Sequence, residues 1–206
     1  MTRICRGPMT LRHLSHHFLI LATLSTVACH AQTVMRKATP GDANAAAGKV
    51  TAPTLPSGAS ELKIDRKQIM SLSVIPALTL VPVRFSKNAG AAGPPFHQCG
   101  LVTVNGTGET HLIVTFGTDW TEAESCVSLS AIGTTESKSK YPALVLIYQA
   151  TTGHESFPEP VVLKWNAASG IYELDAERSQ WITTQQLPYT IPNIRRLLAK
   201  NPGERK

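Results

Sequence analysis

Hydrophobic and polar residues alternate along much of the chain beyond Glu61. A period of two places successive side chains on opposite faces of a strand, so each alternating stretch predicts a β-strand or a hairpin with one buried face. The continuous hydrophobic run over 141–150 predicts a strand that is buried on both faces. The alternating stretches are 70–74, 78–85, 99–116, 126–132 and 161–175.

One stretch near the end of the chain carries helix signals. Pro192 would occupy the first position of a helix that runs to Lys200, and Asn201 and Pro202 would end it. We therefore expect a mainly β fold, an antiparallel meander of about seven or eight strands that forms a sandwich or an open barrel, with a short C-terminal helix.

The first residues have the order of a signal peptide. Arg3, Arg6 and Arg12 precede the apolar run 18–28, and small residues follow it. The apolar run has about half the length that a membrane-spanning helix needs, so we interpret it as the core of a signal peptide over 1–31. The protein is therefore expected to be exported, either to the periplasm or out of the cell.

Two cleavage sites compete within the stretch STVACHAQ. A cut after Ala28 or Ala31 would leave a mature chain without a lipid. A cut immediately before Cys29 would leave a cysteine that carries a lipid anchor. The residues VAC match the end of a bacterial lipobox, but Thr26 stands where that motif usually has an aliphatic residue. Plain export is the favoured interpretation, and lipidation of Cys29 is the alternative.

The remainder of the chain divides by composition. Residues 32–60 contain few large apolar residues and many Ala, Gly, Pro and Thr, which predicts a flexible linker. Residues 61–200 are expected to form a single β-rich domain, and 201–206 a basic tail.

Cys99 and Cys126 are the only cysteines beyond the leader and its boundary. In an oxidising compartment two such thiols are expected to form a disulfide. Two alternatives remain open: His97 and Cys99 as half of a metal site, or Cys99 as a nucleophile beside His97. The paired ligand spacing of a structural zinc site is absent from the sequence, so we predict no metal and no cofactor.

The net charge of +6 does not indicate a nucleic-acid partner. The leader arginines and the C-terminal residues beyond Ile194 account for the excess of positive charge, and the region between them is close to neutral. The basic residues at the C-terminus are not interleaved with aromatic residues, so we predict no nucleic-acid binding. The membrane is expected as a partner only through a lipid on Cys29.

The candidate site residues lie in two places. The stretch 151–160 is predicted to be a loop stiffened by two prolines, and it carries a candidate binding surface for another protein. His97 is the other histidine we consider for chemistry. The candidate binding residues in the loop are His154, Glu155, Phe157 and Glu159.

The sequence favours a non-enzymatic binding module that acts on another protein, as an inhibitor or an immunity-type protein does. In broad build such a module is similar to small periplasmic lysozyme inhibitors and immunity proteins, although no shared motif supports the analogy. One alternative is a small extracytoplasmic hydrolase that uses His97, His154 or Glu155. Another is a surface component that associates through the stretch 78–85, because Pro82 predicts that this strand lies at an edge or a bend. The oligomeric state stays open.

Overall fold

The computed structural model describes residues 33–74, 77–87, 96–116, 125–135, 139–153 and 155–200. These residues belong to one compact unit, Gln32–Lys206. The predicted signal peptide, Cys29 and the predicted tail 201–206 lie outside the described residues.

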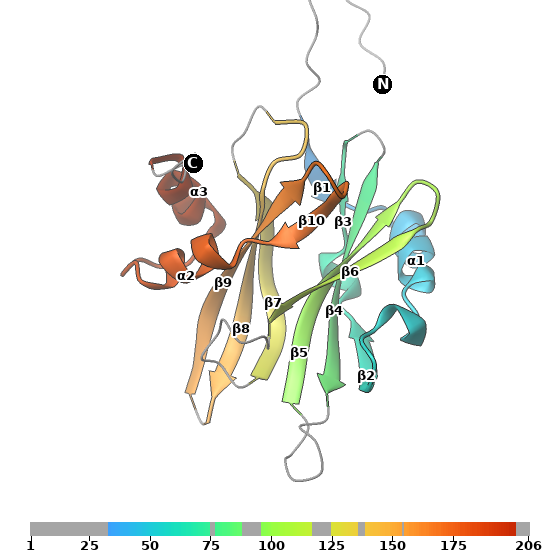
Figure 1. The fold of residues 1–206 in the computed structure, drawn as a ribbon, viewed down its shortest axis with the longest axis horizontal. Helices are drawn as coiled ribbons and strands as arrows, with labels where there is room; N and C mark the ends of the chain where they lie inside the picture. Colours follow the sequence, from blue (N-terminus) through green and yellow to red (C-terminus); the bar gives the residue numbers. More distant parts are fainter. Residues whose placement is uncertain are drawn as a thin grey trace, which may run out of the picture. The chain divides into compact units, whose positions relative to one another are not determined.

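Ten strands of the described residues form two antiparallel sheets (Figure 1). The first sheet has the order β1-β3-β4-β5-β6, and β2 also pairs with β4. Its strands are β1 (Met35–Lys37), β2 (Ala59–Ile64), β3 (Met70–Leu72), β4 (Leu78–Lys87), β5 (Phe96–Asn105) and β6 (Thr110–Phe116). The second sheet has the order β10-β9-β8-β7. Its strands are β7 (Ser125–Thr134), β8 (Leu144–Thr152), β9 (Glu155–Asn166) and β10 (Ile171–Leu174).

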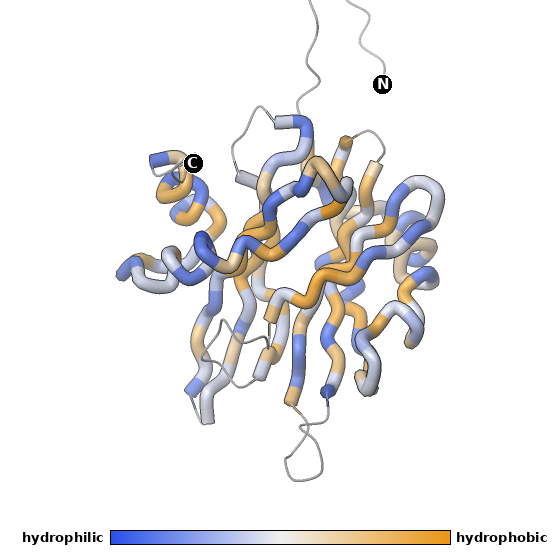
Figure 2. Tube along the Cα trace, in the orientation of Figure 1, coloured by the Kyte–Doolittle hydropathy of each residue, from blue (hydrophilic) through white to orange (hydrophobic). Residues whose placement is uncertain are grey.

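The main hydrophobic core lies between the two sheets. Alternation along β4 turns Leu78 and Leu80 toward this core, and the second sheet contributes residues such as Leu146 and Leu163. Hydrophobic residues accordingly gather along the middle of the strands (Figure 2). The predicted fold class is confirmed: the protein is a sandwich of two packed sheets, neither of which closes on itself.

The expected flexible linker over 32–60 is wrong for the described residues 33–60. They contain β1, the helix α1 (Pro40–Lys49), the 3₁₀ turn η1 (Ala52–Thr54) and the start of β2. Thr39 accepts a hydrogen bond from the backbone N–H of Asp42 and caps α1. Ala46 and Ala47 then pack in a second core on the outer face of the first sheet. The segment needs few large apolar residues because Ala46 and Ala47, with Val50, are enough to pack α1 against the sheet.

Two further helices cover the outer face of the second sheet. They are α2 (Ala176–Thr183) and α3 (Ile191–Lys200), and the second agrees with the predicted C-terminal helix. Ile182 and Ile194 are fully buried there against β8 and β9. A Cβ atom at Gly133 of β7 would lie 2.6 Å from Cγ2 of Ile191, so the missing side chain allows α3 to approach the strand.

The prediction of an edge at Pro82 is wrong, because β4 has partners on both sides. Pro82 lies opposite Leu101 of β5, and on the other side it falls between the stretches of β4 that pair with β3 and with β2. Its carbonyl oxygen accepts the backbone N–H of Asp65 at 3.0 Å. In an extended residue the backbone nitrogen and the carbonyl point to the same side of the strand. The side on which Pro82 lacks an N–H is therefore the side of β2 and β3, at the gap between them, where no strand needs that donor. The hypothesis that the protein associates with itself through this strand therefore has no support, because the strand is not at an edge.

Among the described residues, no helix is long and apolar enough to cross a membrane.

Candidate functional site

One end of the sandwich gathers polar side chains from both sheets. The ends of β4 and β8 and the starts of β2, β5, β7 and β9 meet there, at the lower edge of Figure 1. The backbone N–H of His97 in β5 donates to Ser125 Oγ of β7 at 3.1 Å, and this bond joins the two sheets. The backbone carbonyl of Ser125 accepts Thr151 Oγ1 of β8 at 3.3 Å.

The centre of this end is a chain of three side chains, which we call the Glu61–Ser86–His97 relay. Ser86 Oγ donates to Glu61 Oε2 at 2.8 Å and lies 3.1 Å from His97 Nδ1. Ser86 is only 1 % exposed, whereas Glu61 is exposed and His97 is half-buried. The hydroxyl in the middle of the relay is therefore closed to solvent.

Local backbone geometry builds the relay. Ser86 and His97 are directly opposite each other in the β4–β5 ladder, so their side chains lie on one face. The β2–β4 register shifts between Ser60 and Lys63, which is a β-bulge. Within it Glu61 has φ 52°, in the left-handed region that only a few per cent of non-glycine residues adopt. The bulge turns the carboxylate toward Ser86, as bulges near functional sites often do.

The order of the groups decides what the relay can do chemically. In a nucleophile–base–acid triad the imidazole stands between the hydroxyl and the carboxylate. Here the hydroxyl of Ser86 stands in the middle and gives its hydrogen to Glu61. Ser86 Oγ can then accept only from an Nδ1–H of His97, and this tautomer leaves Nε2 of His97 as the basic nitrogen. The relay can orient and polarise His97, but it does not activate Ser86.

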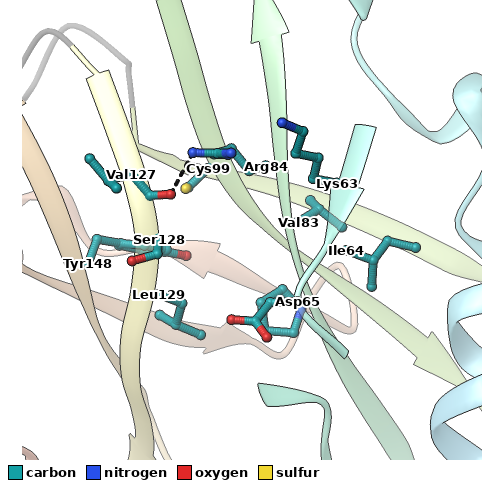
Figure 3. A pocket seen from close by; sticks show the side chains of 11 residues that line it. Lys63, Ile64, Asp65, Val83, Arg84, Cys99, Val127, Ser128, Leu129 and Tyr148 are labelled. Atoms are coloured by element: carbon teal, nitrogen blue, oxygen red, sulfur yellow. Dashed lines mark hydrogen bonds between the residues drawn. The ribbon is translucent and has the colours of Figure 1, made fainter. Parts of the chain in front are cut away.

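A pocket of about 170 Å³ lies on the same side of β4, two residues from Ser86. Figure 3 shows Arg84 reaching across to β7, where its Nη1 donates to the carbonyl oxygen of Val127 at 2.7 Å. Lys63 and Asp65 add charges to the wall. Ligand pockets generally measure 300–1,000 Å³, so this one fits a few waters or a small ion and not a substrate.

The predicted disulfide is confirmed. Cys99 of β5 and Cys126 of β7 are bonded, with Cα atoms 5.8 Å apart, and the bond joins the two sheets beside this pocket. The two alternative predictions for Cys99, a thiol nucleophile and a metal-bound thiolate, are therefore wrong. The disulfide is compatible with an oxidising compartment. Across the described residues, no group of three or more His, Cys, Asp and Glu is placed to hold a metal ion.

The predicted site residues are not all brought together. His97 has Ser86 as its side-chain partner, and Glu155 lies exposed at the start of β9. His154 lies outside the described residues. Only His97 among the hydrolase candidates thus takes part in a described side-chain network.

The predicted loop 151–160 is instead a tight hairpin. Thr152 of β8 pairs with Glu155 of β9, which leaves a two-residue turn that begins at Gly153 with φ 57°. Phe157 packs against the main core, so its ring is part of the scaffold. Glu159 is half-buried in β9. Among the candidate binding residues described, Glu155 is therefore the one exposed at the tip.

Two buried hydroxyls reinforce the adjoining core. Tyr148 Oη lies 2.7 Å from Thr115 Oγ1, and Thr115 Oγ1 donates to the carbonyl oxygen of Cys99 at 3.2 Å. Burial raises the pKa of Tyr148 well above its ordinary value, and the hydrogen bond with Thr115 offsets part of that rise. Burial likewise raises the pKa of Tyr172, whose hydroxyl donates to the carbonyl oxygen of Pro142. Both tyrosines are neutral structural groups at neutral pH.

Sequence reasoning missed Glu61 and Ser86. The alternation places Ser86 on the same face of its strand as Arg84, but no local signal marks the bulge that turns Glu61 toward it.

Comparison with protein-family models, curated proteins and solved structures found no significant match to this chain.

Proposed function

We propose that this chain is an exported, non-enzymatic binding module that neutralises another protein, in the manner of an inhibitor or an immunity-type protein. The observation that carries the proposal is the β8–β9 hairpin, whose strands stay paired out to Thr152 and Glu155. The partner strand β7 is bonded to the first sheet through Cys126. Strands that are paired and cross-linked in this way lose little conformational entropy on binding.

The Glu61–Ser86–His97 relay supports a binding role over acyl transfer. Its hydroxyl is buried and donates away from the imidazole, so it is not poised as a nucleophile. The relay instead links β2, β4 and β5 at the end of the sandwich that also carries the hairpin. In this proposal the surface at the lower end of the sandwich is the contact surface.

The binding proposal is tested by capture from an envelope extract followed by inhibition of the captured protein. Ser156→Arg places a bulky charge beside the hairpin turn, at an exposed residue that accepts a hydrogen bond from Gln149. Thr107→Arg is the matched control, because Thr107 is also an exposed, hydrogen-bonded hydroxyl residue at a hairpin turn. We expect Ser156→Arg to abolish capture and inhibition and Thr107→Arg to preserve both. A captured enzyme that keeps full activity at saturation would contradict the proposal.

Export is tested separately by the intact mass of the native mature protein. A chain that begins near Gln32 without added mass indicates plain export, and one that begins at Cys29 with diacylglyceryl and acyl mass indicates a lipoprotein. Retention of residues 1–31 would contradict export.

The strained backbone of Glu61 favours one second candidate, a hydrolase with His97 as general base. Left-handed non-glycine residues cluster at functional sites. The test compares wild type with His97→Gln on a panel of activated esters. Turnover that requires His97 supports the hydrolase, and equal background rates argue against it.

A further inference from the structure

A second and larger cavity lies at one end of the second sheet, between β9, α2, α3 and the residues that precede β8. Its volume is about 540 Å³. That is within the range of 300–1,000 Å³ typical of small-molecule sites. It lies near Trp165 at the far end of β9 from the hairpin tip at Glu155. At about 3.3 Å per residue, the two ends of β9 are roughly 36 Å apart.

Three cationic side chains from three different elements line this cavity. They are Lys164 of β9, Arg178 of α2 and Arg195 of α3. The lining residues described include no carboxylate. Residues so far apart in the sequence converge on one cavity only because α2 and α3 fold back over the sheet.

The two guanidinium groups are held in place by the fold. Arg195 donates from Nε to the carbonyl oxygen of Thr134, at the end of β7. Arg178 Nη1 lies 3.6 Å from Asp175 Oδ2. Fixed guanidinium groups lose little entropy when they bind a carboxylate or a phosphate, and they can do so with two parallel hydrogen bonds.

Asp175 only partly offsets the positive charge. Its other oxygen, Oδ1, accepts the backbone N–H of Arg178 and caps α2. Lys164 is exposed and lies opposite Glu173 of β10, and Arg195 contacts a neutral carbonyl. With Asp175 and Glu173 both counted, the three lining cations still leave a net positive charge.

An aromatic wall completes the cavity. The rings of Tyr141 and Trp165 stack with centroids 3.8 Å apart, and both residues line the cavity. Lys140 Nζ lies 5.2 Å from the Tyr141 ring centroid and adds a further cation beside the wall. Cations on one side and aromatic rings on the other suit a ligand that has an anionic group attached to a ring.

We infer that this cavity binds a small anionic ligand, a phosphate or a carboxylate carried on a ring, through Lys164, Arg178 and Arg195. The inference does not rest on the proposed protein partner, because the two surfaces lie at opposite ends of β9.

The test is titration calorimetry of the mature chain at low ionic strength with three probes. Phenyl phosphate carries a phosphate on a phenyl ring, benzoate carries a carboxylate on the same ring, and inorganic phosphate has no ring. We expect millimolar or tighter binding of one ring-bearing probe, with weaker binding of inorganic phosphate. The probe that binds better identifies the anionic group.

Lys164→Gln and Arg178→Gln locate the site. We expect Lys164→Gln to weaken binding about fivefold, and Arg178→Gln about tenfold or more because a guanidinium donates charge-assisted hydrogen bonds. Lys67→Gln is the matched control, since Lys67 is an exposed lysine in the 3₁₀ turn η2 (Arg66–Gln68) outside this cavity. Circular dichroism verifies the fold of each variant.

Two outcomes overturn the inference. One is that neither ring-bearing probe binds at millimolar concentration. The other is that Lys67→Gln weakens binding as much as Lys164→Gln, which would mean a general attraction of anions to a basic protein. Arg178→Gln could unfold α2, but Lys164→Gln alone still decides the question.

Discussion

Glu61 combines a hydrogen bond to Ser86 with a strained backbone, and Glu61→Ala removes the first without relieving the second. The substitution removes the carboxylate that accepts a hydrogen bond from the buried Ser86, and it leaves the backbone at φ 52°. A hydrogen bond to a charged group contributes about 1.5 kcal/mol at the lower end of its range, which suits an exposed carboxylate. We therefore expect the free energy of unfolding to fall by about 1.5 kcal/mol.

Glu61→Gly loses the same hydrogen bond but also removes the strain of the left-handed backbone conformation. A left-handed conformation costs a residue with a side chain roughly 1–2 kcal/mol, and glycine adopts it freely. The greater entropy of glycine in the unfolded chain offsets about 0.5–1 kcal/mol of that relief. Glu61→Gly should thus be more stable than Glu61→Ala by about 0.5–1 kcal/mol, although it is the smaller residue.

Urea unfolding followed by far-ultraviolet circular dichroism measures both differences. A double-mutant cycle with Ser86→Ala isolates the hydrogen bond, because Glu61→Ala should cost almost nothing once the hydroxyl is gone. Ser60→Ala, an exposed neighbour in β2, is the control and should change stability little. Equal stabilities of Glu61→Ala and Glu61→Gly would refute the inference that the backbone at Glu61 is strained. An unchanged cost of Glu61→Ala in the Ser86→Ala background would refute the bond.

Three further predictions concern stability. Cys99→Ala/Cys126→Ala should lower the free energy of unfolding by about 3.5 kcal/mol in urea, from the separation of 27 residues that the bond spans, and reductant should then have no further effect. Gly133→Ala should cost about 1–3 kcal/mol and lower the melting temperature, because its methyl group would lie 2.6 Å from a side-chain carbon of α3. Burial raises the pKa of Tyr148 and Tyr172, so above pH ~10 the unfolded chain releases two protons that the folded chain retains. Urea unfolding at successive alkaline pH values should therefore show stability falling by up to about 2.7 kcal/mol per pH unit, and a flat profile would contradict their burial.

Much of the β-sandwich was predictable because side-chain alternation has a direct physical meaning. The hairpin over 161–175, for example, brings Trp165 opposite Tyr172, with ring centroids 5.1 Å apart. The sequence does not show how the turn after Asn105 is made. Gly108 has the positive φ there, and Asn105 accepts the backbone N–H groups of Thr107 and Glu109 through its side chain. Alternation determines which face of a strand each side chain occupies, but the conformation of a turn depends on which of several possible local hydrogen bonds form.

The errors have a common cause, which is that tertiary partners are invisible in a local pattern. Composition alone suggested a linker before Glu61, yet α1 packs through Ala46 and Ala47 on a sheet that forms from distant residues. Pro82 suggested an edge, yet β2 and β3 share one side of β4 and leave a gap opposite the proline. The convergence of Lys164, Arg178 and Arg195 depends on the packing of α2 and α3, so no spacing in the sequence reveals it.

The disulfide lies where the apolar core of the sandwich gives way to polar contacts. The inward face of β4 carries Leu78 and Leu80 before Pro82, and Arg84 and Ser86 after it. β4 itself therefore supplies hydrophobic residues to the core between the sheets only over its first half, and over its second half the neighbouring strands supply them, through Phe116, Ala150 and Phe157. There the sheets are joined by the bond between Cys99 and Cys126, by Arg84 to the carbonyl of β7, and by the backbone of β5 to Ser125. A covalent link at this boundary lets one end of the sandwich keep polar, chemically useful side chains facing inward without letting the sheets separate.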